Sequence, residues 1–97
     1  MDVALYVSSK FQSYSSGVFV DSTCGNNKNP MNPNHAVNIV GYGTSSTGQD
    51  YYILRNTWGT SWGMQGYMYF ARDTNGNTDQ CNNKVLFAFY LFYLHFI

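Results

Sequence analysis

The stretch NPNHAVNIVGYG, residues 32–43, decides the fold together with YYILRNTWGTSWGMQGY, residues 51–67. Both contain runs of β-branched and aromatic residues bounded by glycine or asparagine, a pattern typical of strands joined by turns. The polar segment GTSSTGQD, residues 43–50, separates them and predicts a hairpin-like connection. His35 opens one strand and Asn56 closes the next, so we expect the two residues at the ends of neighbouring strands.

The composition supports a small β-rich domain. The sequence has 97 residues, with nine tyrosines, seven phenylalanines, two tryptophans and nine glycines. A chain of this length forms at most one small domain with a thin core. The formal net charge is zero and 10% of the residues are charged, so a basic surface for nucleic acid is not expected.

Shorter elements are predicted on either side of the two strands. Phe11 and Tyr14, at positions i and i+3, share one face of a single helical turn that ends at Gly17. Loops are predicted where asparagine, glycine, proline and other polar residues gather. The further predicted strands are residues 3–7, 18–20 and 67–72, and the predicted loops are residues 21–34 and 73–83.

The last segment, VLFAFYLFYLHFI, residues 85–97, contains one polar side chain, His95. It is too short for a membrane span, which needs about 20 residues. Three interpretations stay open: a buried strand, a shallow membrane contact, or sequence translated beyond the natural end of the protein. Free apolar tails favour aggregation.

Cys24 and Cys81 are far apart and lack the CxxC spacing of a zinc or redox site. An even cysteine count in a small chain suits one structural disulfide, worth about 3–4 kcal/mol for a long loop. Such a bond implies an oxidising compartment. Two free thiols, or a nucleophilic Cys24, are the alternatives. The opening MDVALYVSSK has no signal-peptide pattern, so we expect the natural N-terminus to lie further upstream.

His35 and Asn56 are the side chains best suited to chemistry. Histidine is the usual general base near neutral pH, and it needs an orienting partner on its second ring nitrogen. The amide oxygen of Asn56 can orient the ring without strongly raising its pKa, which suits an enzyme that pairs a thiolate with an imidazolium. Trp58 would shield the His–Asn hydrogen bond from water. The alternative is structural: a histidine in a turn, an asparagine in a loop and tryptophans in a core.

The order of these motifs resembles the C-terminal half of a papain-like cysteine peptidase of the cathepsin type. The family has a His-Ala-Val strand ending in Gly-Tyr-Gly, then a strand leading into Asn-Ser-Trp-Gly, a second Trp-Gly and Gly-Tyr. This chain has NHAVNIVGYG and YYILRNTWGTSWGMQGYMYFAR, with Thr57 in place of the usual serine. FQSYSSGVF, residues 11–19, also resembles the family, and the resemblance covers about residues 3–81.

The resemblance implies roles for five residues. His35 would be the catalytic base, Asn56 its orienting residue and Trp58 the shield, and Cys24 would be bonded to Cys81. In the family the nucleophile lies far upstream in a Cys-Gly-Ser-Cys-Trp-like motif. The sequence contains neither this motif nor the oxyanion-hole glutamine that precedes it. The glutamines present lie in other contexts: Gln12, Gln49, Gln65 and Gln80.

The resemblance also implies small, neutral walls for the second specificity pocket, which would suit an apolar substrate side chain. The corresponding residues are Ala4, Pro33, Asn34 and Ala36. Two departures from the family pattern are present. NNKVLFAF, residues 82–89, replaces the usual Gly-Ile-Ala segment, and Asn38 replaces an apolar strand residue. Asn38 therefore requires a hydrogen-bond partner or a solvent-facing position.

The expected fold is mainly β (partial α+β): the β-rich C-terminal half of a papain-like fold, an antiparallel barrel-like sheet with one short helical turn. Residues 1–84 would form the partial peptidase domain and residues 85–97 an apolar tail outside the family pattern. The face that packs on the missing helical half would be apolar and uncovered, which predicts marginal stability or aggregation.

The expected function is that of a fragment of a papain-like cysteine endopeptidase, which carries the histidine and asparagine, lacks the nucleophile and is inactive alone. The alternatives are a non-catalytic module that docks on a related protease or propeptide, and an unrelated β-rich structural domain. The expected partners are a peptide or protein substrate and the missing N-terminal helical half. We expect no cofactor, metal, nucleic acid or membrane partner, and a lysosomal or extracellular location.

Overall fold

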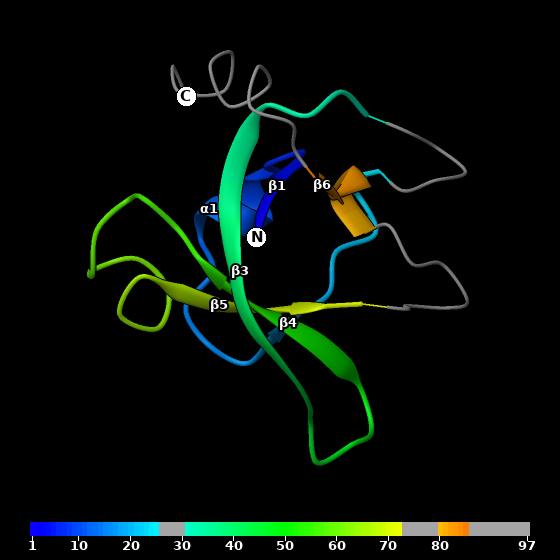
Figure 1. Cartoon of the computed structure of the whole chain (residues 1–97), viewed down its shortest axis with the longest axis vertical. Coiled ribbons are helices and arrows are strands. Elements are labelled where there is room, and N and C mark those ends of the chain that lie inside the picture. Colours follow the sequence, from blue (N-terminus) through cyan, green and yellow to red (C-terminus); the bar gives the residue numbers. More distant parts are fainter. Residues whose placement is uncertain (26–30, 73–79, 86–97) are drawn as a thin grey trace.

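One mixed β-sheet organises the chain, as a computed structural model that describes residues 1–25, 31–72 and 80–85 shows (Figure 1). The strand order is β2-β5-β4-β3-β1-β6. Two short helical segments accompany the described strands, so the expectation of a mainly β fold is confirmed. The strands are β1 (Asp2–Leu5), β2 (Val18–Phe19), β3 (His35–Thr44), β4 (Asp50–Arg55), β5 (Tyr67–Ala71) and β6 (Lys84–Val85), and the helical segments are α1 (Ser9–Gln12) and the 3-10 helix η1 (Gln80–Asn82).

The antiparallel meander β3–β4–β5 forms the centre of the sheet, and the predicted hairpin between β3 and β4 is present. The chain reverses near Gly48, whose φ of +86° lies in the left-handed region that glycine adopts without steric penalty. The register shifts between Ile39 and Gly41, which marks a β-bulge with Val40 as the extra residue. The bulge bends β3, so the same strand begins in a buried part of the sheet at His35 and ends in an exposed part near Tyr42.

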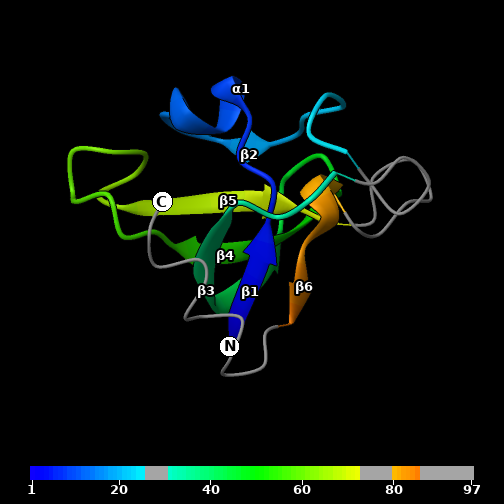
Figure 2. The same ribbon diagram turned by 90° about the horizontal axis from the view of Figure 1, so that it is seen from above.

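The sheet is not antiparallel throughout. β2 pairs with β5 in parallel, whereas β1 pairs antiparallel with β3 and with β6. Figure 2 shows α1 next to β2, the edge strand of the sheet, with both above β5. Phe11 of α1 meets Phe19 of β2 edge to face at 5.6 Å, and Phe19 stacks on Phe70 of β5 at 6.0 Å. These aromatic contacts fasten the helical turn to the sheet.

A disulfide between Cys24 and Cys81 ties the segment after β2 to η1. Its surroundings are hydrogen-bonded: Cys81 N–H donates to Gly25 O at 3.0 Å, and Tyr6 N–H donates to Cys81 O at 2.7 Å. Both sulfurs are fully buried. The predicted bond is therefore present, and the alternatives of free thiols or a nucleophilic Cys24 are wrong.

Several predicted boundaries differ from the structure. The first strand ends at Leu5 rather than Val7, because Val7 N–H donates to the side chain of Asn34 at 2.7 Å instead of to a strand. Residues 80–82, predicted as loop, form η1. The predicted tail, residues 85–97, lies outside the described residues apart from Val85 in β6, so the proposed boundary at residue 84 stays a prediction. Within the described ranges, no helix is long and apolar enough to cross a membrane.

Candidate active site

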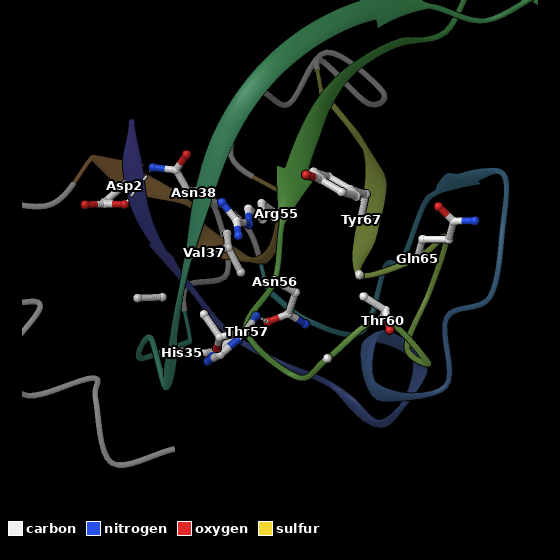
Figure 3. A pocket seen from close by; sticks show the side chains of 13 residues that line it. Asp2, His35, Val37, Asn38, Arg55, Asn56, Thr57, Thr60, Gln65 and Tyr67 are labelled. Carbon is white, nitrogen blue, oxygen red and sulfur yellow. Dashed lines mark hydrogen bonds between the residues drawn. The ribbon is translucent and has the colours of Figure 1, made fainter.

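The side chains of His35 and Asn56 meet at the end of two neighbouring strands, as the sequence suggests they could. His35 is the first residue of β3, and Asn56 directly follows the last residue of β4. His35 Nε2 lies 2.7 Å from Asn56 Oδ1 (Figure 3). Both side chains are buried, with exposed fractions of 3% and 7%.

Backbone pairing on both sides fixes this meeting point. His35 lies opposite Leu5 of β1, so the first residue of β3 is already inside the sheet. Asn56 continues from β4, and its N–H donates to Gly66 O at 3.0 Å. Gly66 has a φ of +91°, which allows the loop of residues 57–66 to return its carbonyl to this point.

The tautomer of His35 follows from a second donor to the asparagine. Thr57 N–H donates to Asn56 Oδ1 at 2.8 Å. A backbone N–H can only donate, so the atom it faces is the amide oxygen and not the amide nitrogen. The same oxygen faces His35 Nε2, which must then carry the proton and donate. Nδ1 is left with its lone pair, the form of imidazole that accepts a proton as a general base.

Nδ1 is buried and has no hydrogen-bond partner among the described residues. Burial lowers the pKa of His35 below its ordinary value of 6.5, and the hydrogen bond with Asn56 opposes that change in part. The ring is therefore held neutral near pH 7, with one nitrogen anchored and the other available.

Aromatic rings cover the pair on one side. Trp58 stacks on His35, with ring centroids 4.8 Å apart and planes 21° apart. Phe11 of α1 meets Trp58 edge to face at 5.7 Å and stacks on Trp62 at 5.5 Å. Trp62 Nε1–H donates to Gln12 O at 3.0 Å, which ties this cluster back to α1. The cluster removes water that would compete for the His–Asn hydrogen bond.

From the sequence, Trp58 alone is predicted to cover the His–Asn pair. The covering role of Phe11 and Trp62 was not predicted. Phe11 shares a face with Tyr14 on the predicted helical turn, and that spacing is the signal that could have found it. Both rings reach Trp62, Phe11 at 5.5 Å and Tyr14 at 5.6 Å.

A pocket of about 700 Å³ lies beside the pair. Its lining includes Asp2 of β1, Asn38 of β3, Arg55 of β4 and Tyr67 of β5, so the sheet forms part of the wall, and the loop of residues 57–66 forms another part (Figure 3). Asn38 Nδ2 donates to Asp2 Oδ1 at 2.7 Å, which gives Asn38 the partner that the sequence requires. Polar and apolar groups both line this pocket, and the expected uncovered apolar face stays a prediction.

Of the four residues predicted to face substrate, the structure places one in the lining of the pocket and the other three outside it. Ala4 of β1 lies directly opposite Ala36 of β3, and Ala36 lines the pocket. Asn34 is used by the backbone: its Oδ1 accepts from Val7 N–H at 2.7 Å, and its N–H donates to Leu5 O at 3.0 Å. Among the described residues that line the pocket, Pro33, Asn34 and Ala4 do not appear. Their substrate-binding roles stay predictions.

In the described part of the chain, no group of three or more His, Cys, Asp or Glu side chains is placed to hold a metal ion.

Comparison with known proteins identifies the family of this chain. Residues 1–89 match the papain family of cysteine proteases. The chain belongs to this family. Among similar papain-family proteins, cathepsin L of Sarcophaga peregrina is 45% identical over 71 residues, which are 73% of this chain and 19% of that protein. Fruit bromelain of Ananas comosus is 43% identical over 74 residues, which are 76% of this chain and 19% of that protein.

Solved papain-family structures share the fold. The bromelain protease from Ananas comosus in complex with the E64 inhibitor has a TM-score of 0.65 at 43% identity, over 76% of this chain and 32% of that chain. Digestive procathepsin L2 proteinase from the larval midgut of Tenebrio molitor has a TM-score of 0.69 at 42% identity, over 84% of this chain and 23% of that chain. This chain corresponds to the C-terminal, β-rich part of the papain fold, as the sequence predicts.

Proposed function

We propose that this chain carries the general base, His35, and the orienting amide, Asn56, of a papain-type cysteine endopeptidase. The nucleophilic thiolate would come from another part of a longer polypeptide. The observation that carries the proposal is the 2.7 Å contact from Nε2 to Asn56 Oδ1, which leaves Nδ1 buried, unprotonated and without a partner among the described residues. A base in this state is prepared to take the proton of a thiol.

The proposed reaction uses Nδ1 of His35 in every proton transfer. A cysteine thiol next to Nδ1 gives its proton to the ring, and the resulting thiolate attacks the carbonyl carbon of the peptide. The C–N bond breaks as Nδ1–H returns the proton to the leaving amine. Water, deprotonated by the same nitrogen, then hydrolyses the thioester. Asn56 keeps the proton on Nε2 throughout, and Trp58 keeps solvent away from that hydrogen bond.

The chain alone is expected to be inactive. Its sequence contains two cysteines, and both sulfurs are consumed by the buried Cys24–Cys81 disulfide. A thiolate cannot form at either position without reduction of that bond, so these 97 residues offer a base without a nucleophile.

The substrate is proposed to be a peptide with an apolar side chain next to the scissile residue. Ala36 lines the pocket beside His35 and lies opposite Ala4, which supports a small, uncharged wall at Ala36 itself, while Asp2 and Arg55 line other parts of the pocket. Pro33 and Asn34 would extend the wall on the other side of His35. The buried disulfide supports folding in an oxidising compartment, lysosomal or extracellular.

The first test is peptidase activity. The 97-residue chain, with a fluorogenic dipeptide substrate, is expected to show no turnover; turnover that an epoxide inhibitor abolishes would contradict this. In a longer polypeptide that contains this segment, His35→Ala is expected to lower kcat/KM by about 10²–10⁴-fold.

A second candidate is a non-catalytic module that docks on a related protease or its propeptide. The specific observation in its favour is a pocket of about 700 Å³ beside a base that has no nucleophile in the same chain. The intact mass of the protein from its natural source separates the two. A mass of 11.0 kDa would favour the docking module, and a larger mass would favour the peptidase.

A further inference from the structure

A buried carboxylate outside the pocket has no role in the reaction described above. Asp21, in the segment after β2, has an exposed fraction of 5%. Its Oδ2 accepts from Ser8 Oγ–H at 2.6 Å, and its Oδ1 accepts from Thr23 N–H at 2.8 Å and Thr23 Oγ1–H at 2.6 Å. Burial of an ionised carboxylate is unfavourable unless hydrogen bonds replace its water, and these three bonds do so.

Ser8 links this carboxylate to α1. Its hydroxyl proton points to Asp21, while its oxygen accepts from Phe11 N–H at 3.2 Å as the N-cap of the helix. A four-residue helix (Ser9–Gln12) is too short to be stable by itself, so its position depends on its cap and on the packing of Phe11. Asp21 therefore fixes which way the capping hydroxyl points.

Phe11 carries the link from α1 to the His–Asn pair. Its side chain is completely buried, and its ring meets His35 edge to face at 6.4 Å and Trp58 at 5.7 Å. Trp58 in turn stacks on His35. A shift of α1 would move Phe11 away from both rings and open the cover over the imidazole.

The other side of Asp21 is anchored to the sheet. Its N–H donates to Gln80 Oε1 at 2.7 Å, and Gln80 Nε2 donates to Phe19 O of β2 at 3.2 Å and to Ala71 O of β5 at 3.0 Å. Gln80 is itself buried and precedes the disulfide-bonded Cys81. The network thus runs without a break from the disulfide and the sheet, through Asp21 and Ser8, to the helix over His35.

We propose that Asp21 is a positioning residue for the His35–Asn56 pair and acts through Ser8 and Phe11 by holding α1 against the imidazole. The proposal rests on the proposed role of that pair, but its test reads the state of the His35 ring and not peptidase activity. Loss of the proposed function and loss of the proposed linkage are therefore separate outcomes.

The test is an NMR titration of the His35 ring in the 97-residue chain. Ser8→Gly removes the hydroxyl that joins Asp21 to α1, while glycine remains an acceptable N-cap residue. The expected result is an upward shift of the His35 pKa toward 6.5, because burial is what lowers it, together with loss of the pure Nε2–H tautomer. Ser8→Thr keeps a hydroxyl at this position, so its His35 pKa and its Nε2–H tautomer are expected to match those of the unsubstituted chain.

Thr23→Val is the matched control. It removes a hydrogen bond of the same length, 2.6 Å, from the same carboxylate, but leaves Ser8 and α1 intact. The His35 pKa is expected to stay unchanged in this variant. An equal shift of the His35 pKa in Thr23→Val would overturn the proposal, because the effect would then be a general loosening of the fold. No shift in Ser8→Gly would also overturn it, because the linkage from Ser8 to His35 would then be absent.

A measurement on the unsubstituted chain applies if Ser8→Gly does not fold. Hydrogen exchange of the Phe11 amide reports opening of the cap, and exchange of the His35 Nε2 proton reports opening of the pair. The proposal expects the two protons to exchange through one opening event, with matching dependence on denaturant. A Phe11 amide that exchanges freely while the His35 proton stays protected would refute it.

Discussion

The two ends of β3 differ sharply in how far their side chains are exposed to solvent. At the beginning of the strand, His35 is 3% exposed, and at the far end Tyr42 is 77% exposed. Both belong to β3, but His35 pairs with Leu5 of β1 and Tyr42 pairs with Tyr52 of β4, with Val40 as the extra residue of the bulge between them. Within the part of the chain that the structure describes, α1 and two tryptophans lie over the beginning of β3, whereas its far end leads into the turn around Gly48.

Polar groups are treated differently at the two ends. Near Tyr42, Thr44 Oγ1–H donates to Asp50 Oδ1 at 2.6 Å in an exposed position, where water can replace either partner. Near His35, the side chain of Asn56 is buried and serves two donors at once. Loss of a partner is therefore expected to be severe at the beginning of β3 and mild at its far end.

The largest expected effect is removal of the ring that covers the buried end. Phe11→Ala leaves a cavity between α1, Trp58 and Phe19, and the free energy of unfolding is expected to fall by about 3–5 kcal/mol. Urea denaturation followed by tryptophan fluorescence measures this. A loss below about 1 kcal/mol would show that α1 does not cover the site in solution.

The next effect comes from the asparagine. Asn56→Ala leaves His35 Nε2–H and Thr57 N–H without their acceptor, with an expected loss of about 1–3 kcal/mol in the free energy of unfolding. The His35 ring should also lose its single tautomer, which ¹⁵N chemical shifts report. Asn56→Asp keeps an acceptor in place and is the control, expected to preserve the Nε2–H tautomer.

The pH dependence of stability provides a third comparison. The folded-state pKa of His35 lies below its ordinary value of 6.5, so the unfolded chain binds more protons when the pH falls through that value. The free energy of unfolding is therefore expected to decrease on acidification below 6.5. His35→Gln removes this group, and its stability curve should lack the step. If the free energy of unfolding of the unsubstituted chain instead increases as the pH falls below 6.5, the burial of the ring is contradicted.

Asp21 adds a separate step at lower pH. Burial alone would raise the pKa of its carboxyl, but hydrogen bonds from Ser8 and Thr23 lower it overall below its ordinary value of 3.8. Its contribution to stability is therefore present above 3.8 and is lost as the pH falls through its lower, folded-state value. Asp21→Asn should remove this step, which can be told apart from the step of His35 because the two groups titrate in different ranges.

The smallest effect is expected at the exposed end. Tyr42→Ala removes a ring of the same size class as Phe11, but from a position that solvent already surrounds. The free energy of unfolding is expected to change by no more than about 0.5 kcal/mol. A loss comparable to that of Phe11→Ala would mean that the far end of β3 is covered in solution.

The two central strands could be predicted because each is a long run with its own boundaries. HAVNIVGYG and YYILRN carry clear alternation or apolar character between glycine-rich segments, and they place His35 and Asn56 by themselves. The parallel pairing of β2 with β5 could not be predicted, since a two-residue strand (Val18–Phe19) has no local signature of its partner. The local sequence pattern therefore predicts only those strands and helices that are long enough to show a periodic alternation of side chains.

The contacts of the candidate site could likewise be predicted only in part. The sequence shows that Asn38 needs a partner, but only the register of β1 against β3 identifies Asp2. The link from Gln80 through Asp21 to Ser8 joins residues from three separate segments, and no spacing in the sequence announces it. Contacts of this kind depend on tertiary packing, which is where reasoning from one sequence ends.

The strand order has a consequence for how the chain folds. β3, β4 and β5 follow one another in the sequence and pair as neighbours, so they can form early with short loop closures. β1 is made first but lies between β3 and β6, and it completes its ladder only when the segment at Lys84–Val85 arrives. The rate of folding is therefore expected to be set by the docking of β1 on β3, and the second edge of β1 stays unpaired until Lys84–Val85 joins it.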